Sequence, residues 1–132
     1  MTFEPLTFRF SEAMVLAADL HRHQARKGTA IPYISHLLAV AAVALEFGAD
    51  ENEAIAALLH DAIEDAPAQL GQERATVVRR LIEMKFGRGV LDLVTARASS
   101  STQRAADRRA HHRYARVLFH SPPTRLRGIA PP

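Results

Sequence analysis

The apolar segment from Ile34 to Phe47 restricts the possible folds of this chain more than any other feature. Pro32 precedes it, Gly48 follows it, and Glu46 is its first charged residue. The segment is shorter than the eighteen or more apolar residues of a membrane span. A proline before and a glycine after an apolar run are typical helix boundaries. We therefore expect a helix here, buried on most of its sides, in a protein that does not cross a membrane.

Apolar residues recur at helical spacing on both sides of this segment. They predict a first helix from about Thr7 to His23, with Thr7 or Ser11 as its N-terminal cap. They also predict a helix from about Glu73 to Phe86 that Gly87 ends. The alternation of polar and apolar residues that is typical of strands does not occur. The pattern favours a single all-α helical bundle.

A further helix is predicted between these elements. Asp50 can cap its start, and Glu53 three residues later completes a pattern that resembles a capping box. Pro67 closes the region, and a short apolar segment at 90–94 lies further along the chain.

Composition indicates one domain of a protein without disulfides. The chain has 132 residues, of which 48% are hydrophobic, which is enough for one core and too little to favour two. It has no cysteine, and its N-terminus lacks the pattern of a secretion signal. We therefore expect a cytoplasmic protein.

The net charge of +3 is distributed unevenly along the chain. Residues 96–132 hold eight of the 17 basic residues, all of them Arg, and one acid, Asp107, so the remaining part is acidic. We predict a folded domain at 1–95 and a basic, poorly ordered tail at 96–132. Nucleic acid is not an expected partner, except through phosphate contacts of this tail.

Four polar residues stand out in the helix that is predicted to begin at Asp50. At about 100° per residue, His60, Asp61, Glu64 and Asp65 would share one arc, opposite an apolar arc. Imidazole and carboxylate groups together suit divalent ions such as manganese, iron or zinc rather than copper(I). A chance His-Asp pair and a solvated helix end are the alternative interpretations.

His36 is expected in the first turn of the neighbouring helix, in an otherwise almost entirely apolar setting. A buried histidine requires a partner, which is either a backbone group or a shared metal ion. The sequence pattern alone leaves both interpretations open.

Three segments together resemble the HD-domain hydrolases of RelA/SpoT type, including the small alarmone hydrolases. The segments are Arg26-Lys27-Gly28, Pro32-Tyr33-Ile34-Ser35-His36, and Ala56-Ala57-Leu58-Leu59-His60-Asp61-Ala62-Ile63-Glu64-Asp65. His21 and Gln24 also match the family pattern, whereas His23 stands where the family usually has glycine. The resemblance covers residues 8 to about 95 and implies a single HD-domain helical bundle.

The resemblance implies both an activity and its residues. His36, His60 and Asp61 would bind a divalent metal, Mn²⁺, while Glu64 and Asp65 would position or activate the attacking water. Arg26 and Lys27 would contact the guanine ring or the phosphates, although an exposed basic loop is the alternative for this pair. The implied substrate is guanosine tetraphosphate or pentaphosphate, and the implied reaction is removal of its 3′-pyrophosphate.

The resemblance also predicts a domain that is incomplete on its C-terminal side. The family supplies a further aspartate ligand from a later helix, and no segment after Thr95 matches that motif. Asp107 lies in a different sequence setting, and a shifted reading frame or a truncated gene would explain the change. Hydrolysis of another nucleotide and a catalytically inactive domain are therefore the alternative functions.

Overall fold

The computed structural model describes residues 2–98, and for the last two of these it describes the backbone alone. The described part is helical, and it contains an isolated bridge between Ala25 and Pro32 but no strand. The elements in chain order are α1 (Phe8–Leu20), α2 (Ile34–Glu46), α3 (Glu51–Leu59), the 3-10 turn η1 (Ala68–Leu70), α4 (Arg74–Phe86) and α5 (Arg88–Ala98). The prediction of an all-α fold is confirmed.

Local capping signals determine where two of the helices begin. The Thr7 side chain accepts a hydrogen bond from the backbone N–H of Arg9, so Thr7 rather than Ser11 caps α1. Asp50 accepts one from the N–H of Glu53 at 2.8 Å and caps α3. Each cap satisfies a backbone donor that the first helical turn leaves unpaired.

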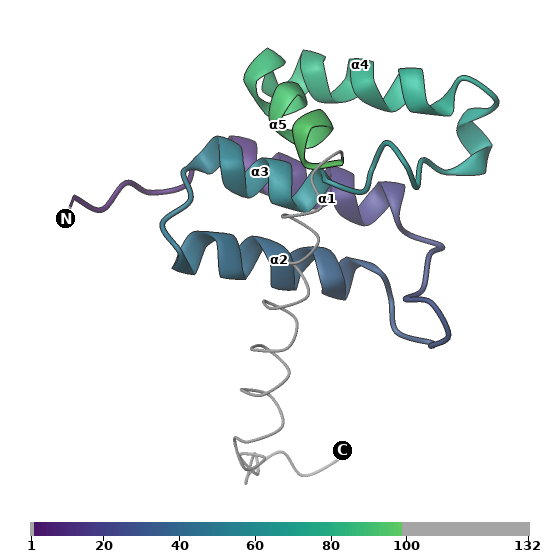
Figure 1. The fold of residues 1–132 in the computed structure, drawn as a ribbon, viewed down its shortest axis with the longest axis horizontal. Helices are drawn as coiled ribbons and strands as arrows, with labels where there is room; N and C mark the ends of the chain where they lie inside the picture. The colour runs from purple at the N-terminus through teal and green to yellow at the C-terminus, as the bar shows by residue number, and fades with distance from the viewer. Residues whose placement is uncertain (1, 99–132) are drawn as a thin grey trace, which may run out of the picture.

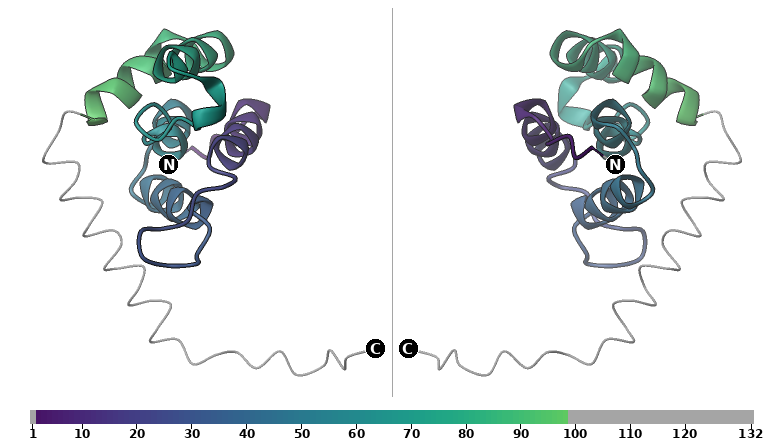
Figure 2. Two further views of the ribbon diagram at one scale, coloured as in Figure 1. Left: turned by 90° about the vertical axis from the view of Figure 1, so that its right-hand side faces the viewer. Right: turned by 90° about the vertical axis from the view of Figure 1, so that its left-hand side faces the viewer.

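Helix α3 lies in the middle of the bundle. Figures 1 and 2 show it between α2 on one side and α4 with α5 on the other, next to α1. Its residues 54–59 are all buried, and it contacts α1, α2 and α5. Three of these six residues are alanines, whose small side chains let neighbouring helices approach closely.

The expectation that the helix at 34–47 is buried on most sides is wrong for the described structure. α2 buries Leu37, Val40 and Ala41, whereas Leu38 is 41% exposed. The reason is position, because α2 lies at the edge of the bundle and packs mainly against α3 (Figure 1). Hydropathy alone predicted burial but could not show that this helix has few neighbours.

The helix predicted from about Glu73 to Phe86 is confirmed to within one residue by α4. Gly87 ends α4 with a φ of 92°, a conformation that glycine adopts without steric cost. The apolar segment at 90–94 belongs to a longer helix, α5, which continues past the predicted boundary at residue 95. Val90 and Val94 of α5 are buried against the core. The predictions for residues 99–132 lie outside the described residues.

A polar cluster ties the start of α1 to two other helices. Glu51, in the first turn of α3, accepts hydrogen bonds from the backbone N–H and the hydroxyl of Thr7 and from Arg9 Nη1. Arg9 Nη2 donates to the carbonyl of Phe86 at the end of α4, at 2.7 Å. Arg9 therefore connects α1, α3 and α4.

No helix within residues 2–98 is both long and apolar enough to span a membrane.

Candidate metal centre

His36 reaches the centre of the molecule from the first turn of α2. Its backbone N–H donates to the carbonyl of Tyr33 at 3.0 Å, and α2 begins between the two residues. Pro32 restricts the backbone just before this turn. The His36 side chain is 14% exposed and directed toward the end of α3.

The polar residues that follow Leu59 do not continue α3, contrary to the prediction. α3 ends at Leu59, and residues 60–65 form successive turns. His60 Nδ1 lies 2.6 Å from the carbonyl oxygen of Ala57, the acceptor that the Asp61 N–H would use if the helix continued. The side chain thus competes with the backbone for that carbonyl. The predicted polar arc of a continuous helix is therefore incorrect.

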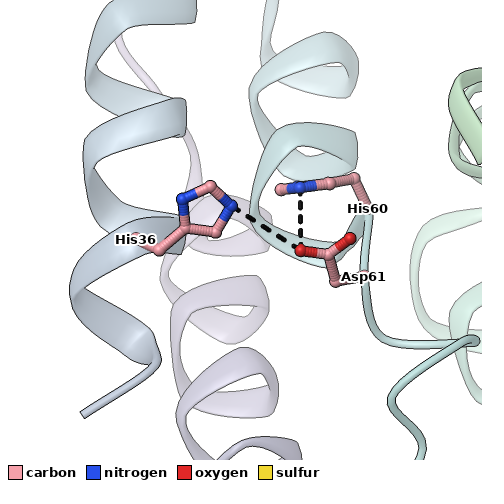
Figure 3. Close-up of side chains that lie close together, drawn as sticks. All are labelled: His36, His60 and Asp61. Carbon is pink, nitrogen blue, oxygen red and sulfur yellow. Dashed lines mark ion pairs between the residues drawn. The ribbon is translucent and has the colours of Figure 1, made fainter. Parts of the chain in front are cut away.

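The turn nevertheless brings His60 and Asp61 to His36. The Nε2 atoms of His60 and His36 lie 3.0 and 3.6 Å from Asp61 Oδ2. Figure 3 shows the two rings, from α2 and from the end of α3, converging on one carboxylate oxygen. One ligand atom from each of the three residues can be chosen so that all lie within 4.8 Å of one another.

The tautomer of His60 is fixed by its backbone partner. A carbonyl oxygen can only accept, so Nδ1 carries a proton, and Nε2 is the ring nitrogen that can offer a lone pair to a cation. Nε2 lies 3.0 Å from Asp61 Oδ2, so a proton or a cation between these two atoms would hold them together. Backbone hydrogen bonding at one ring nitrogen is the usual support for a histidine that binds metal through the other. The three donors fit a divalent ion of the manganese, iron or zinc type.

The surroundings keep Asp61 ionised. Burial alone would raise the pKa of its carboxyl group, but interactions with His36, His60 and Tyr33 outweigh burial and hold that pKa well below its usual range. A carboxylate that is ionised at neutral pH is ready to bind a cation.

Tyr33 contacts this cluster, and no role was predicted for it. Its hydroxyl donates a hydrogen bond to Asp61 Oδ2. Burial, followed by this hydrogen bond, raises the pKa of Tyr33 far above its ordinary value, so the phenol remains a donor. Its position three residues before His36, at the start of the same helix, is the signal that would have indicated it.

The two predicted water-activating residues occupy different environments. Glu64 is exposed and lies outside the three-residue cluster. Asp65 is half-buried, and its Oδ2 accepts a hydrogen bond from Gln24 Nε2 at 3.2 Å. A cleft of about 550 Å³ borders Asp65 and Gln24, with Arg22 and His23 also in its lining.

Arg26 and Lys27, predicted to contact substrate, lie in the connection between α1 and α2. The Arg26 N–H donates to the carbonyl of Ile31 at 2.8 Å, which closes the loop. Arg26 is half-buried, and its charge partly offsets the raised pKa of Tyr33, whereas Lys27 is exposed. Of the two residues, Arg26 is therefore the one whose charge acts on the cluster's neighbour Tyr33.

Comparison with known proteins gives a family. The sequence pattern described as the HD domain matches residues 13–117, a segment that includes Asp107 and extends beyond the described residues. The bifunctional (p)ppGpp synthase/hydrolase SpoT of Escherichia coli is 38% identical over 86 residues, which is 65% of this chain and 11% of SpoT. The probable guanosine-3′,5′-bis(diphosphate) 3′-pyrophosphohydrolase of Synechocystis is 35% identical over 102 residues, which is 72% of this chain and 12% of that protein.

A third relative matches this chain with a similar identity and coverage. The guanosine-3′,5′-bis(diphosphate) 3′-pyrophosphohydrolase of Vibrio cholerae is 35% identical over 91 residues, covering 69% of this chain and 12% of the relative. The chain thus spans only 11% to 12% of the length of these curated relatives. The family match covers most of this chain, which includes all three residues of the cluster. The chain belongs to the HD domain family.

Proposed function

We propose that this chain is a metal-dependent phosphohydrolase that removes the 3′-pyrophosphate of guanosine tetraphosphate or pentaphosphate. The observation that carries the proposal is the convergence of His36, His60 and Asp61, whose donor atoms lie within 4.8 Å of one another. Relatives named as pyrophosphohydrolases of this nucleotide support the choice of substrate.

In this proposal the three clustered residues hold a divalent ion, with Mn²⁺ as the preferred candidate. Both His60 and Asp61 are suited to this role, because the backbone bond at His60 Nδ1 leaves Nε2 for the ion and the Asp61 pKa is lowered. When bound, such an ion supplies a water of lowered pKa and polarises a phosphoryl oxygen.

The remaining proposed residues serve the water and the nucleotide. Asp65 accepts the proton of the attacking water, since its carboxylate is half-buried and held by the hydrogen bond from Gln24. Exposed Glu64 relays that proton toward solvent. Arg26 and Lys27 bind the phosphates or the guanine ring from the adjoining loop. Water adds to the phosphorus that carries the 3′ oxygen, and the bond between these two atoms breaks. The nucleotide leaves as GDP or GTP with a protonated 3′ oxygen, and the phosphorus that took up the water leaves as pyrophosphate.

The test is pyrophosphate release from guanosine tetraphosphate with added Mn²⁺. We expect the parent protein to be active and the His60→Ala and Asp61→Ala variants to lose activity. Asp92→Ala is the matched control, because this aspartate is 68% exposed and lies on α5, outside the cluster. Activity that survives in both cluster variants would refute the assignment of the metal ligands.

The same assay separates the alternative functions. A parent that ignores this nucleotide but cleaves another member of a nucleotide panel would be a hydrolase of different specificity. A parent that binds Mn²⁺ and cleaves none of them would be an inactive domain.

Metal binding can be measured without substrate by thermal unfolding. Mn²⁺ at one hundred times its dissociation constant stabilises the folded state by about 2.7 kcal/mol. We expect Mn²⁺ to raise the Tm of the parent, EDTA to reverse the shift, and Asp61→Ala to abolish it. An equal shift in parent and variant would place the ion elsewhere.

A further inference from the structure

The connection between α1 and α2 folds back on itself and presents two side chains to the turn at 60–65. An antiparallel bridge pairs Ala25 with Pro32, and the Tyr33 N–H donates to the carbonyl of Gln24 at 2.8 Å. Gln24 and Tyr33 are therefore neighbours across this hairpin, which we define as residues 24–33. Their backbones are held at a fixed separation by the bond between them.

Gln24 fixes one carboxylate of the turn. A carboxylate only accepts hydrogen bonds, so the amide NH₂ of Gln24 faces Asp65 Oδ2, at 3.2 Å. The amide oxygen then faces His21 Nδ1 at 2.7 Å, and this ring nitrogen must carry the proton. His21 is 3% exposed and packs against Tyr33 with a ring separation of 5.1 Å. The Gln24 amide thus bridges the Asp65 carboxylate and the buried His21 ring.

Tyr33 fixes the other carboxylate of the turn. Its hydroxyl donates to Asp61 Oδ2, the oxygen that also faces the Nε2 atoms of His36 and His60. The phenol thereby restricts rotation of the Asp61 carboxylate. Asp61 and Asp65 are four residues apart in a turn that lies beyond the end of α3, where the Asp65 N–H donates to the Asp61 carbonyl at 2.9 Å, and their side chains take their partners from the hairpin.

We propose that Gln24 and Tyr33 are positioning residues, which hold Asp65 and Asp61 from the same hairpin. Tyr33 orients the carboxylate of the metal site, and Gln24 orients the carboxylate that activates water. The inference rests on the proposed function for the role of Asp65. The hairpin also carries Arg26 and Lys27, so substrate contacts and carboxylate positioning share one small element.

The Tyr33 half is tested by isothermal titration of the full chain with Mn²⁺. Loss of a hydrogen bond to a metal ligand typically weakens metal binding by about 10-fold to 100-fold, and we expect a loss in this range for Tyr33→Phe. Gln24→Leu should bind Mn²⁺ like the parent, because the Gln24 side chain bonds Asp65 and His21. Gln72→Leu is the control, since this exposed glutamine lies outside the hairpin. Parent-like affinity in Tyr33→Phe would overturn this half.

The Gln24 half is tested by a double-mutant cycle in the hydrolysis assay. We expect Gln24→Leu to lower kcat by about 100-fold, the cost of a misplaced group, with KM unchanged. In the Asp65→Ala background the same substitution should lower kcat no further. A loop that was merely damaged would cost activity in both backgrounds, and that additive result would overturn the proposal.

A parent protein without activity on guanosine tetraphosphate would refute the proposed function but would still leave the positioning role testable. The Gln24 and Asp65 variants are then compared by urea unfolding, with circular dichroism to verify that each is folded. Positioning through the observed hydrogen bond predicts that the two substitutions are coupled rather than additive. Additive changes would overturn the role of Gln24 independently of substrate.

Discussion

Replacing Glu51 by Gln tests how the bundle is held together at the start of α1. The carboxylate accepts two hydrogen bonds from Thr7 and one from Arg9 Nη1, which lies 3.3 Å from Oε1. The amide of glutamine removes the negative charge and one acceptor while keeping the size of the side chain. The contact between α1 and α3 should weaken without a cavity.

The magnitude follows from the exposure of the partners. A hydrogen bond to a charged group contributes about 1.5 to 3 kcal/mol when it is well shielded. Here Arg9 is 39% exposed and Glu51 18% exposed, so solvent screens the interaction. We expect Glu51→Gln to lower the free energy of unfolding by roughly 1 to 2 kcal/mol at pH 7. For a domain of this size each 1 kcal/mol corresponds to about 4 to 8 °C in Tm.

The effect should depend on pH in a defined direction. The hydrogen bonds from Thr7, with a smaller contribution from Arg9, hold the pKa of Glu51 below its ordinary value of 4.5. The ionised form therefore contributes its full stabilisation above pH 4.5, and the contribution is lost as the pH falls through the lowered pKa. The difference between parent and variant should shrink in acid.

Urea unfolding of both proteins between pH 7 and pH 3 provides the measurement. Glu53→Gln is the matched control, because Glu53 lies in the same first turn of α3 and so controls for loss of charge near the helix N-terminus. An equal loss of stability in both variants would assign the effect to the helix dipole. A difference that stays constant down to pH 3 would refute the role of the Glu51 charge.

Two further substitutions test the core and the helix start. Leu58 is completely buried in α3, so Leu58→Ala should cost about 3 to 4 kcal/mol in denaturant unfolding, whereas Leu38→Ala, at a side chain 41% exposed, should cost less than half as much. Similar losses in the two leucine variants would show that α3 is not the centre of the core. Asp50→Ala removes the cap of α3 and should cost about 1 kcal/mol, measured in the same way, and an unchanged stability would show that the cap bond contributes nothing.

Local signals made most helix positions predictable. Caps at Thr7 and Asp50, and the glycine at position 87, act on the backbone within a few residues, so a sequence pattern can identify them. Only an apolar segment at 90–94 was predicted where the structure has α5, whose burial against the core depends on distant residues. The burial of α2 was overestimated for the same reason, since hydropathy does not show which helices pack around it.

The sequence by itself determined the helical class and provided the candidate residues of the site. Spacing on an assumed continuous helix placed His60, Asp61, Glu64 and Asp65 together for the wrong reason, because His60 bonds the Ala57 carbonyl and α3 ends at Leu59. Only the tertiary structure decided which polar groups meet. It brings His36 to His60 and Asp61, and leaves Glu64 in solvent.

The structure also supplied the partners of the two carboxylates. Tyr33 and Gln24 reach Asp61 and Asp65 across 28 and 41 positions of the chain. Helix periodicity and capping depend on residues a few positions apart, so they can be recognised from a short stretch of sequence. Hydrogen bonds between segments so far apart form only when α1, α2 and α3 have packed and brought the hairpin to the turn.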